Sequence, residues 1–497
     1  MEEISCLMQM IYRFTKRDYR KGEVKTMKRF GFRRFRFRRG MILVLAMFMV
    51  ILAGCGGNSG ANANTEATNT SSNNASSSDK GTASTAAAPV KITWWHSMSG
   101  TGEKAINKIV TDFNASHPDI QVEAVYQGKY DESLNKLKAS LGSNSGPDLM
   151  QVYEIGSKFM IDSKMITPVQ KFIDEDKFDL SSLEPNIIRY YTIGGQLNAM
   201  PFNTSNPILY YNKDAFKAAG LDPENPPKTF EEYEAAAKAL SKNGKPGAAI
   251  AIYGWFMEQL FANQNAEYVN GGNGRDQAAT ESLLASDAGV KTLEWWKKMV
   301  DEKAVANLGR DTDDTDSAFA AGQVAMTLNS TAALRKMVDA VGGKFEVGTG
   351  FLPRPEDVKE GGVVVGGASL YIMNNKPEEE QKAAWELIKY VASPEVQAEW
   401  SVSTGYFPIT KAAYDQQVLK DNMAKYPQFQ TAVDQLHASS ASNATSGAVM
   451  GIFPEARQIV EGAIEEALNG KKEPKKALED AAAQITDKLK QYNATVK

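Results

Sequence analysis

Histidine and cysteine, the side chains that most often hold metals or act as nucleophiles, are scarce in this 497-residue sequence. The three histidines are scattered along the chain, and none belongs to a His-Glu-x-x-His zinc motif. The Gly-x-Ser-x-Gly elbow of serine hydrolases and the Gly-x-x-x-x-Gly-Lys-Ser/Thr phosphate loop are also missing. We therefore expect no cofactor and no metal. A glycosidase needs only two carboxylates, so a secreted carbohydrate-active enzyme stays open as an alternative.

Long apolar runs are lacking as well. The apolar stretch near the N-terminus covers only Met41–Ala53, whereas a transmembrane helix needs about 20 apolar residues. Seven basic residues and no acidic one lie between Met27 and Arg39, shortly before this stretch. A basic region followed by a short apolar core and small residues is typical of a secretory signal. We predict that residues 1–54 form a signal peptide region, with Met27 as an alternative translation start.

Cys6 and Cys55 are the only cysteines in the chain. The tetrapeptide Leu52-Ala53-Gly54-Cys55 resembles the bacterial lipobox, in which the cysteine is diacylated and becomes the first residue of the mature protein. We therefore predict lipidation at Cys55, with a buried structural cysteine as the weaker alternative. Because Cys6 would be removed and Cys55 acylated, the mature chain would have neither a disulfide nor a cysteine metal site.

Basic residues are in deficit once the signal region is removed. The full chain has a formal charge of −4, and residues 1–54 contain 13 basic and 4 acidic side chains, so the mature charge falls to about −13. Proteins that bind nucleic acid need a basic face, so we expect no nucleic-acid partner.

Residues 56–89 contain three charges and no large apolar side chain. Such a segment has too little apolar surface to fold by burying it. As a flexible coil it would reach roughly 30 Å. We predict that residues 55–89 form a lipidated, disordered tether between the membrane and a globular body.

Regular structure is predicted from Val90 onward. Hydrophobic periodicity predicts strands at 91–95, 119–126 and 148–153, with helices between them that end by Pro118 and near Leu141. This βαβαβ order favours a parallel sheet covered by helices on both faces. Ligands of such sheets bind beyond the carboxyl ends of the strands, which selects Trp95-His96-Ser97 and Tyr153-Glu154 as candidates.

Three later apolar stripes predict helices at 283–300, 381–391 and 454–468. At roughly 150 residues per domain, residues 90–497 are expected to form two α/β lobes. Many aromatic residues flank turns in this region, and each of them is more easily explained as core than as pocket.

Arg457 has an unusual predicted position. If Pro454 opens the last amphipathic helix, Arg457 lies in the first turn, where the helix dipole disfavours a cation. A helix N-terminus with an arginine is favourable for a phosphate or carboxylate. The alternative is an i,i+4 pair with Glu461 on a solvated face, and the residues alone leave the two interpretations equal.

The aspartate-rich run 311–316 is interpreted as a solvated acidic turn. It has some likeness to a calcium loop, but it lacks the glycine at position six and the oxygen ligands beyond it.

Several motifs are similar to those of the sn-glycerol-3-phosphate-binding proteins of ABC importers, a branch of the family 1 extracellular solute-binding proteins. They include Ile92-Thr93-Trp94-Trp95-His96-Ser97-Met98-Ser99-Gly100, Gln151-Val152-Tyr153-Glu154, Gly366-Gly367-Ala368-Ser369 and Thr404-Gly405-Tyr406. The resemblance runs, with gaps, from residue 90 to about residue 490.

The resemblance implies a two-lobe periplasmic-binding-protein type II fold with a hinge, in which the ligand is enclosed between α/β lobes. Lobe 1 would comprise residues 90–207 and 354–409, and lobe 2 residues 213–349 and 413–497. The ligand-binding residues implied by the family motifs are Tyr130, Glu154, Ser205, Ser330, Gly367, Tyr406 and Arg457, with Trp255 as an additional candidate.

The resemblance also implies a function without chemistry. We expect a lipid-anchored, extracytoplasmic solute-binding protein that binds sn-glycerol-3-phosphate or glycerophosphodiesters and delivers them to ABC permease subunits with a cytoplasmic ATPase. We expect a monomer. The alternatives are a sugar- or oligosaccharide-binding protein of a carbohydrate importer and the secreted enzyme considered above.

Overall fold

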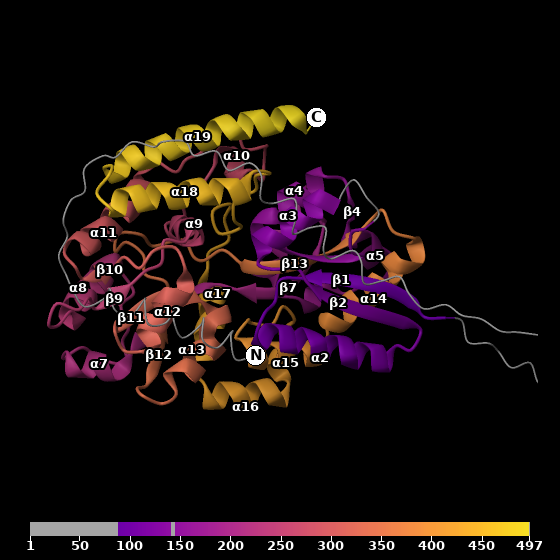
Figure 1. Ribbon diagram of the computed structural model, residues 1–497, viewed down its shortest axis with the longest axis horizontal. Coiled ribbons are helices and arrows are strands. Elements are labelled where there is room, and N and C mark those ends of the chain that lie inside the picture. Colours follow the sequence, from indigo (N-terminus) through magenta and orange to yellow (C-terminus); the bar gives the residue numbers. More distant parts are fainter. Residues whose placement is uncertain (1–87, 141–144, 497) are drawn as a thin grey trace, which may run out of the picture. The chain divides into compact units, whose positions relative to one another are not determined.

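The computed structural model describes residues 88–140 and 145–496 (Figure 1). The predicted signal peptide region 1–54, the lipidation site Cys55 and the tether up to residue 87 lie outside the described residues. The described chain forms two mixed α/β lobes, each built around its own sheet. None of its helices is both long enough and apolar enough to span a bilayer.

The first sheet has the strand order β2-β1-β3-β13-β4, with β7 paired to β13. Its strands are β1 (Val90–His96), β2 (Ile120–Tyr126), β3 (Leu149–Tyr153), β4 (Ile166–Thr167), β7 (Met200–Ser205) and β13 (Gly366–Met373). Strand β1 runs parallel to β2 and β3, which confirms the predicted βαβαβ unit. The sheet is nevertheless mixed rather than purely parallel, because β13 returns from far along the chain and pairs antiparallel with β3, β4 and β7.

The second sheet has the order β10-β9-β11-β8-β12. Its strands are β8 (Pro207–Asn212), β9 (Ala248–Ala249), β10 (Val305–Ala306), β11 (Met326–Ser330) and β12 (Val347–Gly350). Strand β8 pairs antiparallel with β11 through Pro207–Tyr211 and with β12 through Leu209–Asn212. The chain therefore passes from the first sheet to the second at Asn206, between β7 and β8. The lobe boundaries themselves stay a prediction.

Helices cover the two sheets. Those before β8 are α2 (Thr101–Ser116), α3 (Tyr130–Ser140), α4 (Ser157–Asp162), α5 (Val169–Asp176) and α6 (Pro185–Tyr191). Those between β8 and β13 are α7 (Lys213–Ala218), α8 (Phe230–Leu240), α9 (Gly254–Asn263), α10 (Asn270–Asn273), α11 (Asp287–Asp301), α12 (Thr312–Ala320) and α13 (Leu334–Val341). Those after β13 are α14 (Glu378–Val391), α15 (Pro394–Thr404), α16 (Gln417–Lys425), α17 (Gln428–Ala438), α18 (Phe453–Leu468) and α19 (Pro474–Thr495).

The apolar stripes that predicted these helices face the protein interior. In α2 the buried residues are Ile106, Ile109 and Phe113, which recur at helical spacing. Helices α18 and α19 are antiparallel neighbours at one edge of the molecule (Figure 1), joined by an ion pair between Glu455 and Lys488. The burial of one face of each helix accounts for their formation better than local propensity does.

One buried cluster connects the two lobes. It contains Met150 and Tyr153 of β3 in the first lobe together with Leu209 of β8 and Phe256 of α9 in the second. The ligand-binding candidates lie next to this shared cluster.

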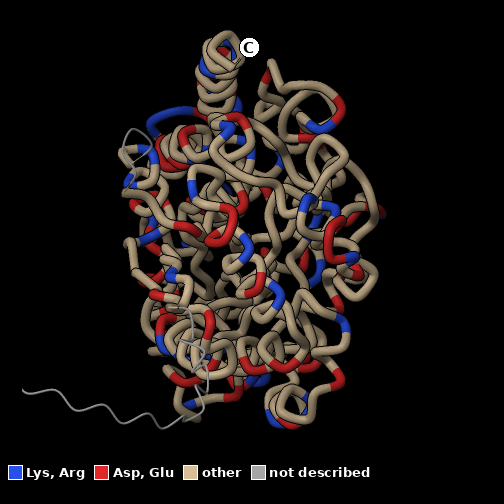
Figure 2. The backbone as a smooth tube through the Cα atoms, turned by 90° about the vertical axis from the view of Figure 1, so that its right-hand side faces the viewer, with Lys and Arg blue, Asp and Glu red and all other residues tan. Residues whose placement is uncertain are grey.

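The side of the molecule shown in Figure 2 has acidic and basic residues interspersed along the chain.

Candidate ligand-binding site

All eight residues selected from the sequence line a single cavity of about 720 Å³. They are Tyr130, Glu154, Ser205, Trp255, Ser330, Gly367, Tyr406 and Arg457. Strand ends place several of them, since Glu154 directly follows β3 and Ser97, another lining residue, directly follows β1. The expectation that the carboxyl ends of these strands border a cavity is therefore confirmed for Ser97, Tyr153 and Glu154.

Trp95 and His96, which were selected by the same rule, are not among the residues that line this cavity. His96 is buried, and desolvation lowers the pKa of its imidazole to about 4. The ring is therefore neutral at pH 7, and its Nδ1 atom accepts a hydrogen bond from the Met98 N–H at 3.3 Å. His96 supports the loop after β1 rather than the cavity.

Gly367 is required by the backbone conformation of β13. Its φ is +98°, and a Cβ atom at this position would lie 1.8 Å from the carbonyl oxygen of Asn203. Only glycine has both this conformation and this close approach at little cost. The strand therefore presents backbone rather than side chain to the cavity at Gly367.

Tyrosine hydroxyls supply neutral hydrogen-bonding groups to the cavity. Tyr130 stacks on Tyr153 with ring centroids 5.3 Å apart, and its hydroxyl accepts a hydrogen bond from Asn203 Nδ2 at 2.8 Å. Tyr406 stacks on Trp400 at 5.8 Å. Burial raises the pKa of both Tyr130 and Tyr406, so both hydroxyls remain protonated and able to donate.

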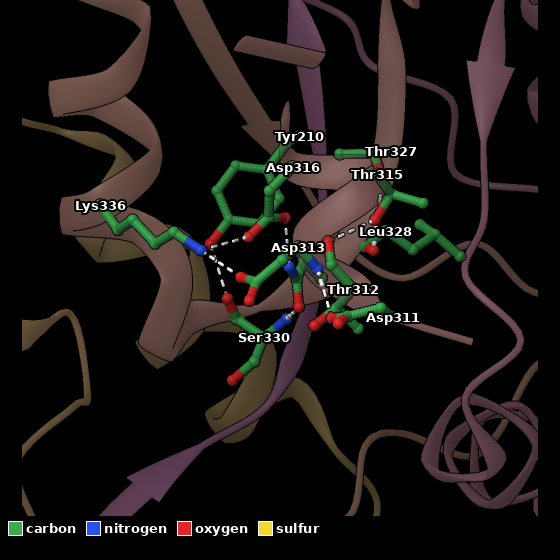
Figure 3. Close-up of polar contacts among 11 residues, drawn as sticks. Tyr210, Asp311, Thr312, Asp313, Thr315, Asp316, Thr327, Leu328, Ser330 and Lys336 are labelled. Carbon is green, nitrogen blue, oxygen red and sulfur yellow. Dashed lines mark hydrogen bonds and ion pairs between the residues drawn. The ribbon is translucent and has the colours of Figure 1, made fainter. Parts of the chain in front are cut away.

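Ser330 is held at three of its atoms at the end of β11. Its carbonyl accepts from the Tyr210 hydroxyl at 2.8 Å (Figure 3). Its N–H donates to Asn329 Oδ1 at 2.7 Å, and its Oγ accepts from the Ala332 N–H at 3.1 Å. The Asn329 amide is itself oriented, because its Nδ2 donates to the buried carboxylate of Asp316. Ser330 is therefore fixed against the cavity by neighbouring elements.

The aspartate run 311–316 begins a helix rather than forming a solvated turn. Asp311 caps α12 by accepting a hydrogen bond from the Asp313 N–H at 3.0 Å. Lys336 of α13 pairs with Asp313, and its Nζ lies 3.4 Å from Asp316 Oδ2. Burial raises the pKa of Asp316. Among the described residues no group of three or more His, Cys, Asp or Glu side chains is arranged to hold a metal ion.

Arg457 is the central charge of the site. Its Nε and Nη2 atoms donate to the two carboxylate oxygens of Glu258 at 2.7 and 2.8 Å, and Nη2 also donates to Glu154 Oε1 at 2.6 Å. The Arg457 and Glu154 side chains are each 6% exposed, and that of Glu258 is 10% exposed. This arrangement leaves Nη1 as the donor available to a ligand, since no described residue accepts from it.

The geometry excludes one of the two interpretations of Arg457. A surface pair with Glu461 is wrong: the Glu461 carboxylate accepts from the Gly254 N–H at 3.1 Å and lies 3.6 Å from Arg310. Helix α18 begins at Phe453, so Arg457 is its fifth residue and lies just beyond the predicted first turn. The guanidinium is buried within the protein rather than solvated.

Gly254 allows the guanidinium to reach its partners. A Cβ atom at Gly254 would lie 2.6 Å from Arg457 Cγ and 2.9 Å from the Arg457 carbonyl oxygen. The absence of a side chain at the start of α9 therefore lets α9 and α18 approach closely. The same approach brings Glu258, one turn further along α9, against Arg457.

Trp255 lies between the cavity and the protein interior. It is 3% exposed and also lines a second, much smaller cavity together with Glu154, Glu258, Tyr190 and Tyr268. A Cβ atom at Gly366 would lie 2.5 Å from the Trp255 ring, so this tryptophan packs directly on β13. The Trp255 ring therefore lies in a wall that also contains the carboxylates of Glu154 and Glu258.

The sequence matches the bacterial extracellular solute-binding proteins over residues 108–431. The chain belongs to this family. It is 34% identical over 420 residues to the sn-glycerol-3-phosphate-binding periplasmic protein UgpB of Escherichia coli K12, an alignment that covers 83% of this chain and 95% of that protein. The resemblance observed in the sequence motifs and the predicted class of solute-binding protein are therefore confirmed.

Solved structures share the fold. The crystal structure of UgpB from Mycobacterium tuberculosis in complex with glycerophosphocholine has a TM-score of 0.69 at 22% identity, covering 81% of this chain and 99% of that one. A cyclic alpha-maltosyl-1,6-maltose binding protein from Arthrobacter globiformis has a TM-score of 0.67 at 24% identity, covering 81% and 100%. At these sequence identities the structural similarity establishes the two-lobe type II fold and does not identify a ligand.

Residues of evident importance for the site were missed in the sequence. Glu258 holds Arg457, Asn329 and Asp316 hold Ser330, and Lys129, Arg310 and Lys336 add further cations to the cavity wall. A signal existed for Glu258, because it is the only charged residue in the predominantly apolar stretch 254–262. Buried carboxylates of this kind generally need a partner.

Proposed function

We propose that this solute-binding protein captures sn-glycerol-3-phosphate or a glycerophosphodiester and delivers it to an ABC importer without altering it. The observation that carries the proposal is the buried guanidinium of Arg457 in a cavity that also offers neutral donors. The 34% identity to the E. coli glycerol-3-phosphate-binding protein supports the same ligand class.

The residues divide into two groups in this proposal. Arg457 Nη1, the Gly367 amide and the hydroxyls of Ser205, Ser330 and Tyr406 would donate to phosphate oxygens. Glu154 and Tyr130 would bind the glycerol hydroxyls, Glu154 as an acceptor and Tyr130 as donor or acceptor. Trp255 would cover the glycerol carbons.

A neutral sugar or oligosaccharide is the second candidate. Its supporting observation is that Trp255 and Tyr130 line the same cavity as the Glu154 carboxylate, because aromatic faces suit sugar rings and a charged acceptor suits sugar hydroxyls. In that case Arg457 would serve only to hold Glu154 in place.

Isothermal titration calorimetry with the globular chain from residue 88 separates these candidates. We expect heat of binding with glycerol-3-phosphate or glycerophosphoglycerol and none with glycerol or maltose. Binding of maltose without binding of either phosphate would favour the sugar candidate. An unchanged ligand recovered after long incubation would support transport, whereas turnover would indicate the enzyme alternative.

We further infer that the protein acts at the outer face of the cytoplasmic membrane, anchored through Cys55, and meets permease subunits there. The supporting feature is the lipobox-like sequence before Cys55. Cys55→Ser should release the protein from the membrane fraction or stop its processing. Normal cleavage with unchanged membrane retention would contradict the anchor.

Closure of the lobes around the ligand is part of the same proposal. The cavity is lined from both lobes, by Tyr130 and Gly367 on one side and by Ser330 and Arg457 on the other. Ligands shared in this way commonly close a hinge. Small-angle scattering should give a smaller radius of gyration with ligand, and identical curves would argue against closure.

A further inference from the structure

Glu258 controls the charge of the site without lining the main cavity. Its carboxylate takes the Nε–Nη2 edge of Arg457 through two hydrogen bonds of 2.7 and 2.8 Å. Bidentate contacts of this kind are the strongest and most directional that arginine makes. Glu258 therefore decides both how Arg457 points and how much of its positive charge a ligand experiences.

The charge count around Arg457 is negative. One guanidinium faces two carboxylates, Glu154 from the turn after β3 and Glu258 from α9, all with side chains at most 10% exposed. A third carboxylate, Glu461 of α18, also lines the cavity, and it lies 3.6 Å from Arg310. When all three carboxylates are ionised, an anionic ligand that enters the cavity meets a surplus of negative charge.

The other titratable groups packed around Glu258 cannot offset this surplus. Tyr253 at the start of α9, Tyr190 of α6 and Tyr268 have pKa values raised by burial, so they remain neutral. The pKa of Glu461 is also raised by burial, so Glu461 competes with Glu258 for a proton. Arg457 itself stays charged, since both carboxylates favour its protonated form.

Protonation of Glu258 would remove one of these negative charges and so reduce the repulsion of an anionic ligand. Burial raises the pKa of Glu258 to about 7, even though the neighbouring guanidinium opposes the rise. A phosphate placed beside Arg457 adds another negative charge within a few ångströms, which disfavours the ionised carboxylate further. The pKa of Glu258 is therefore expected to be higher in the liganded protein than in the free protein.

We propose that Glu258 is a specificity-determining residue that couples the binding of an anionic ligand to the uptake of one proton. The proposal rests on the proposed function, because it requires an anion at Arg457. It predicts that affinity for the anion falls as pH rises above the pKa of Glu258 in the free protein, by up to about tenfold per pH unit for one linked proton. A neutral ligand of the same size would show no such loss.

Calorimetry with glycerophosphoglycerol tests the coupling directly, since a phosphodiester keeps one negative charge between pH 6 and 8.5. The enthalpy is measured in buffers of different ionisation enthalpy, which counts the protons taken up on binding. We expect uptake of a substantial fraction of one proton near pH 7.5 and weaker binding at pH 8.5 than at pH 6.5. Measurable binding without proton uptake would overturn the proposal.

The Glu258→Gln variant assigns the proton, because the amide keeps one acceptor for Arg457 but removes the charge. We expect a flat affinity profile from pH 6.5 to 8.5 and binding at pH 8.5 at least as tight as in the parent. Glu455→Gln, on α18 but exposed and paired with Lys488, is the matched control and should keep the parental profile. A Glu258→Gln protein that retains the parental profile would assign the proton elsewhere and refute the role of Glu258.

The outcomes separate the two levels of the argument. Absence of binding to any phosphate ligand at any pH would refute the proposed function, whereas binding without a pH-dependent proton count would refute only the coupling. If Glu258→Gln fails to fold, the proton count on the parent protein still decides whether coupling exists.

Discussion

Arg457 and Lys336 line the same cavity, and each pairs with two carboxylates, yet the two clusters differ in burial. The Arg457 cluster with Glu154 and Glu258 has side chains 6 to 10% exposed. In the Lys336 cluster the lysine is 55% exposed and its partner Asp313 is 63% exposed, while only Asp316 is buried. One cation with two carboxylates therefore occurs twice in the cavity, once buried from solvent and once largely exposed to it.

The difference lies in what each cluster can contribute. A buried ion pair has paid a large desolvation cost, so removing one partner leaves an uncompensated charge. An exposed pair is screened by water and salt, and its net contribution is usually below about 1 kcal/mol. We infer that Arg457 controls whether an anion binds, whereas Lys336 adjusts how fast and how tightly it does so.

Arg457→Ala is expected to have the largest effect. Removing one partner of a buried charged pair costs about 2–5 kcal/mol in binding, which is roughly 30-fold to several thousand-fold in affinity for a phosphate ligand. Calorimetry with glycerol-3-phosphate measures this loss. Arg335→Ala, an arginine paired with Asp339 on α13, is the matched control and should bind like the parent.

The same variant should also lose stability, which a surface arginine would not. Two buried carboxylates would remain without a cation, at a cost of about 3–5 kcal/mol. Loss of the guanidinium raises the pKa of Glu258 further above its value in the unfolded chain. Stability contributed by a protonated Glu258 is present at low pH and is lost as pH rises through the folded-state pKa. Thermal unfolding should therefore show a larger deficit at pH 8 than at pH 5.5, and equal deficits would contradict the buried cluster.

Arg457→Lys should recover part of the binding. An ammonium keeps the charge but lacks the planar fork that engages Glu258 through two bonds and offers Nη1 to the ligand. We expect an affinity between those of the parent and Arg457→Ala, roughly tenfold below the parent. Full recovery would mean that Arg457 acts only as a point charge.

Asn329→Ala sharpens the comparison from the Lys336 side. The change removes the acceptor of the Ser330 N–H and the donor to the buried Asp316 carboxylate. Leaving such groups unsatisfied costs about 1–3 kcal/mol of stability. Affinity for the phosphate should fall about fivefold, because Ser330 is less well positioned. Asn469→Ala, at an exposed amide that contacts Asn307, is the control. Unchanged affinity with lowered stability would remove Ser330 from the site.

Local patterns explain what could be predicted from the sequence. Strands β1 to β3 and helices α2, α11, α14 and α18 were found because apolar spacing depends only on nearby residues. The cavity residues were found through motifs of the family, each of which is short and contiguous. The antiparallel insertion of β13 was missed, since its pairing with β3 joins residues that are far apart in the chain.

The charge clusters could not be predicted for the same reason. Arg457 meets Glu154 across 303 residues of sequence and Glu258 across 199. Periodicity allowed only the local partner Glu461, so a solvated pair received as much weight as an anion site, and neither interpretation included Glu154 or Glu258. The aspartate run 311–316 was likewise interpreted in isolation, whereas Lys336 and the end of β11 determine its surroundings.

Lys336→Met is expected to have the smallest effect and is the most direct check on the contrast between the two clusters. The substitution keeps an aliphatic side chain and removes a cation that is more than half exposed. Because exposed charges contribute below about 1 kcal/mol, we expect the affinity for the anion to fall by less than about fivefold. The loss should be visible at low ionic strength and disappear at 0.5 M salt, where the screening length falls to roughly 4 Å. It should appear mainly in the association rate, measured by stopped flow, because exposed charges steer an anion towards the cavity. Lys297 pairs with Asp301 on α11, outside the cavity, so Lys297→Met should leave both the association rate and the dissociation rate of the ligand unchanged. A loss of affinity above tenfold that does not depend on salt would show that Lys336 contacts the bound ligand directly. The exposed Lys336 cluster would then be part of the anion site, as Arg457 is.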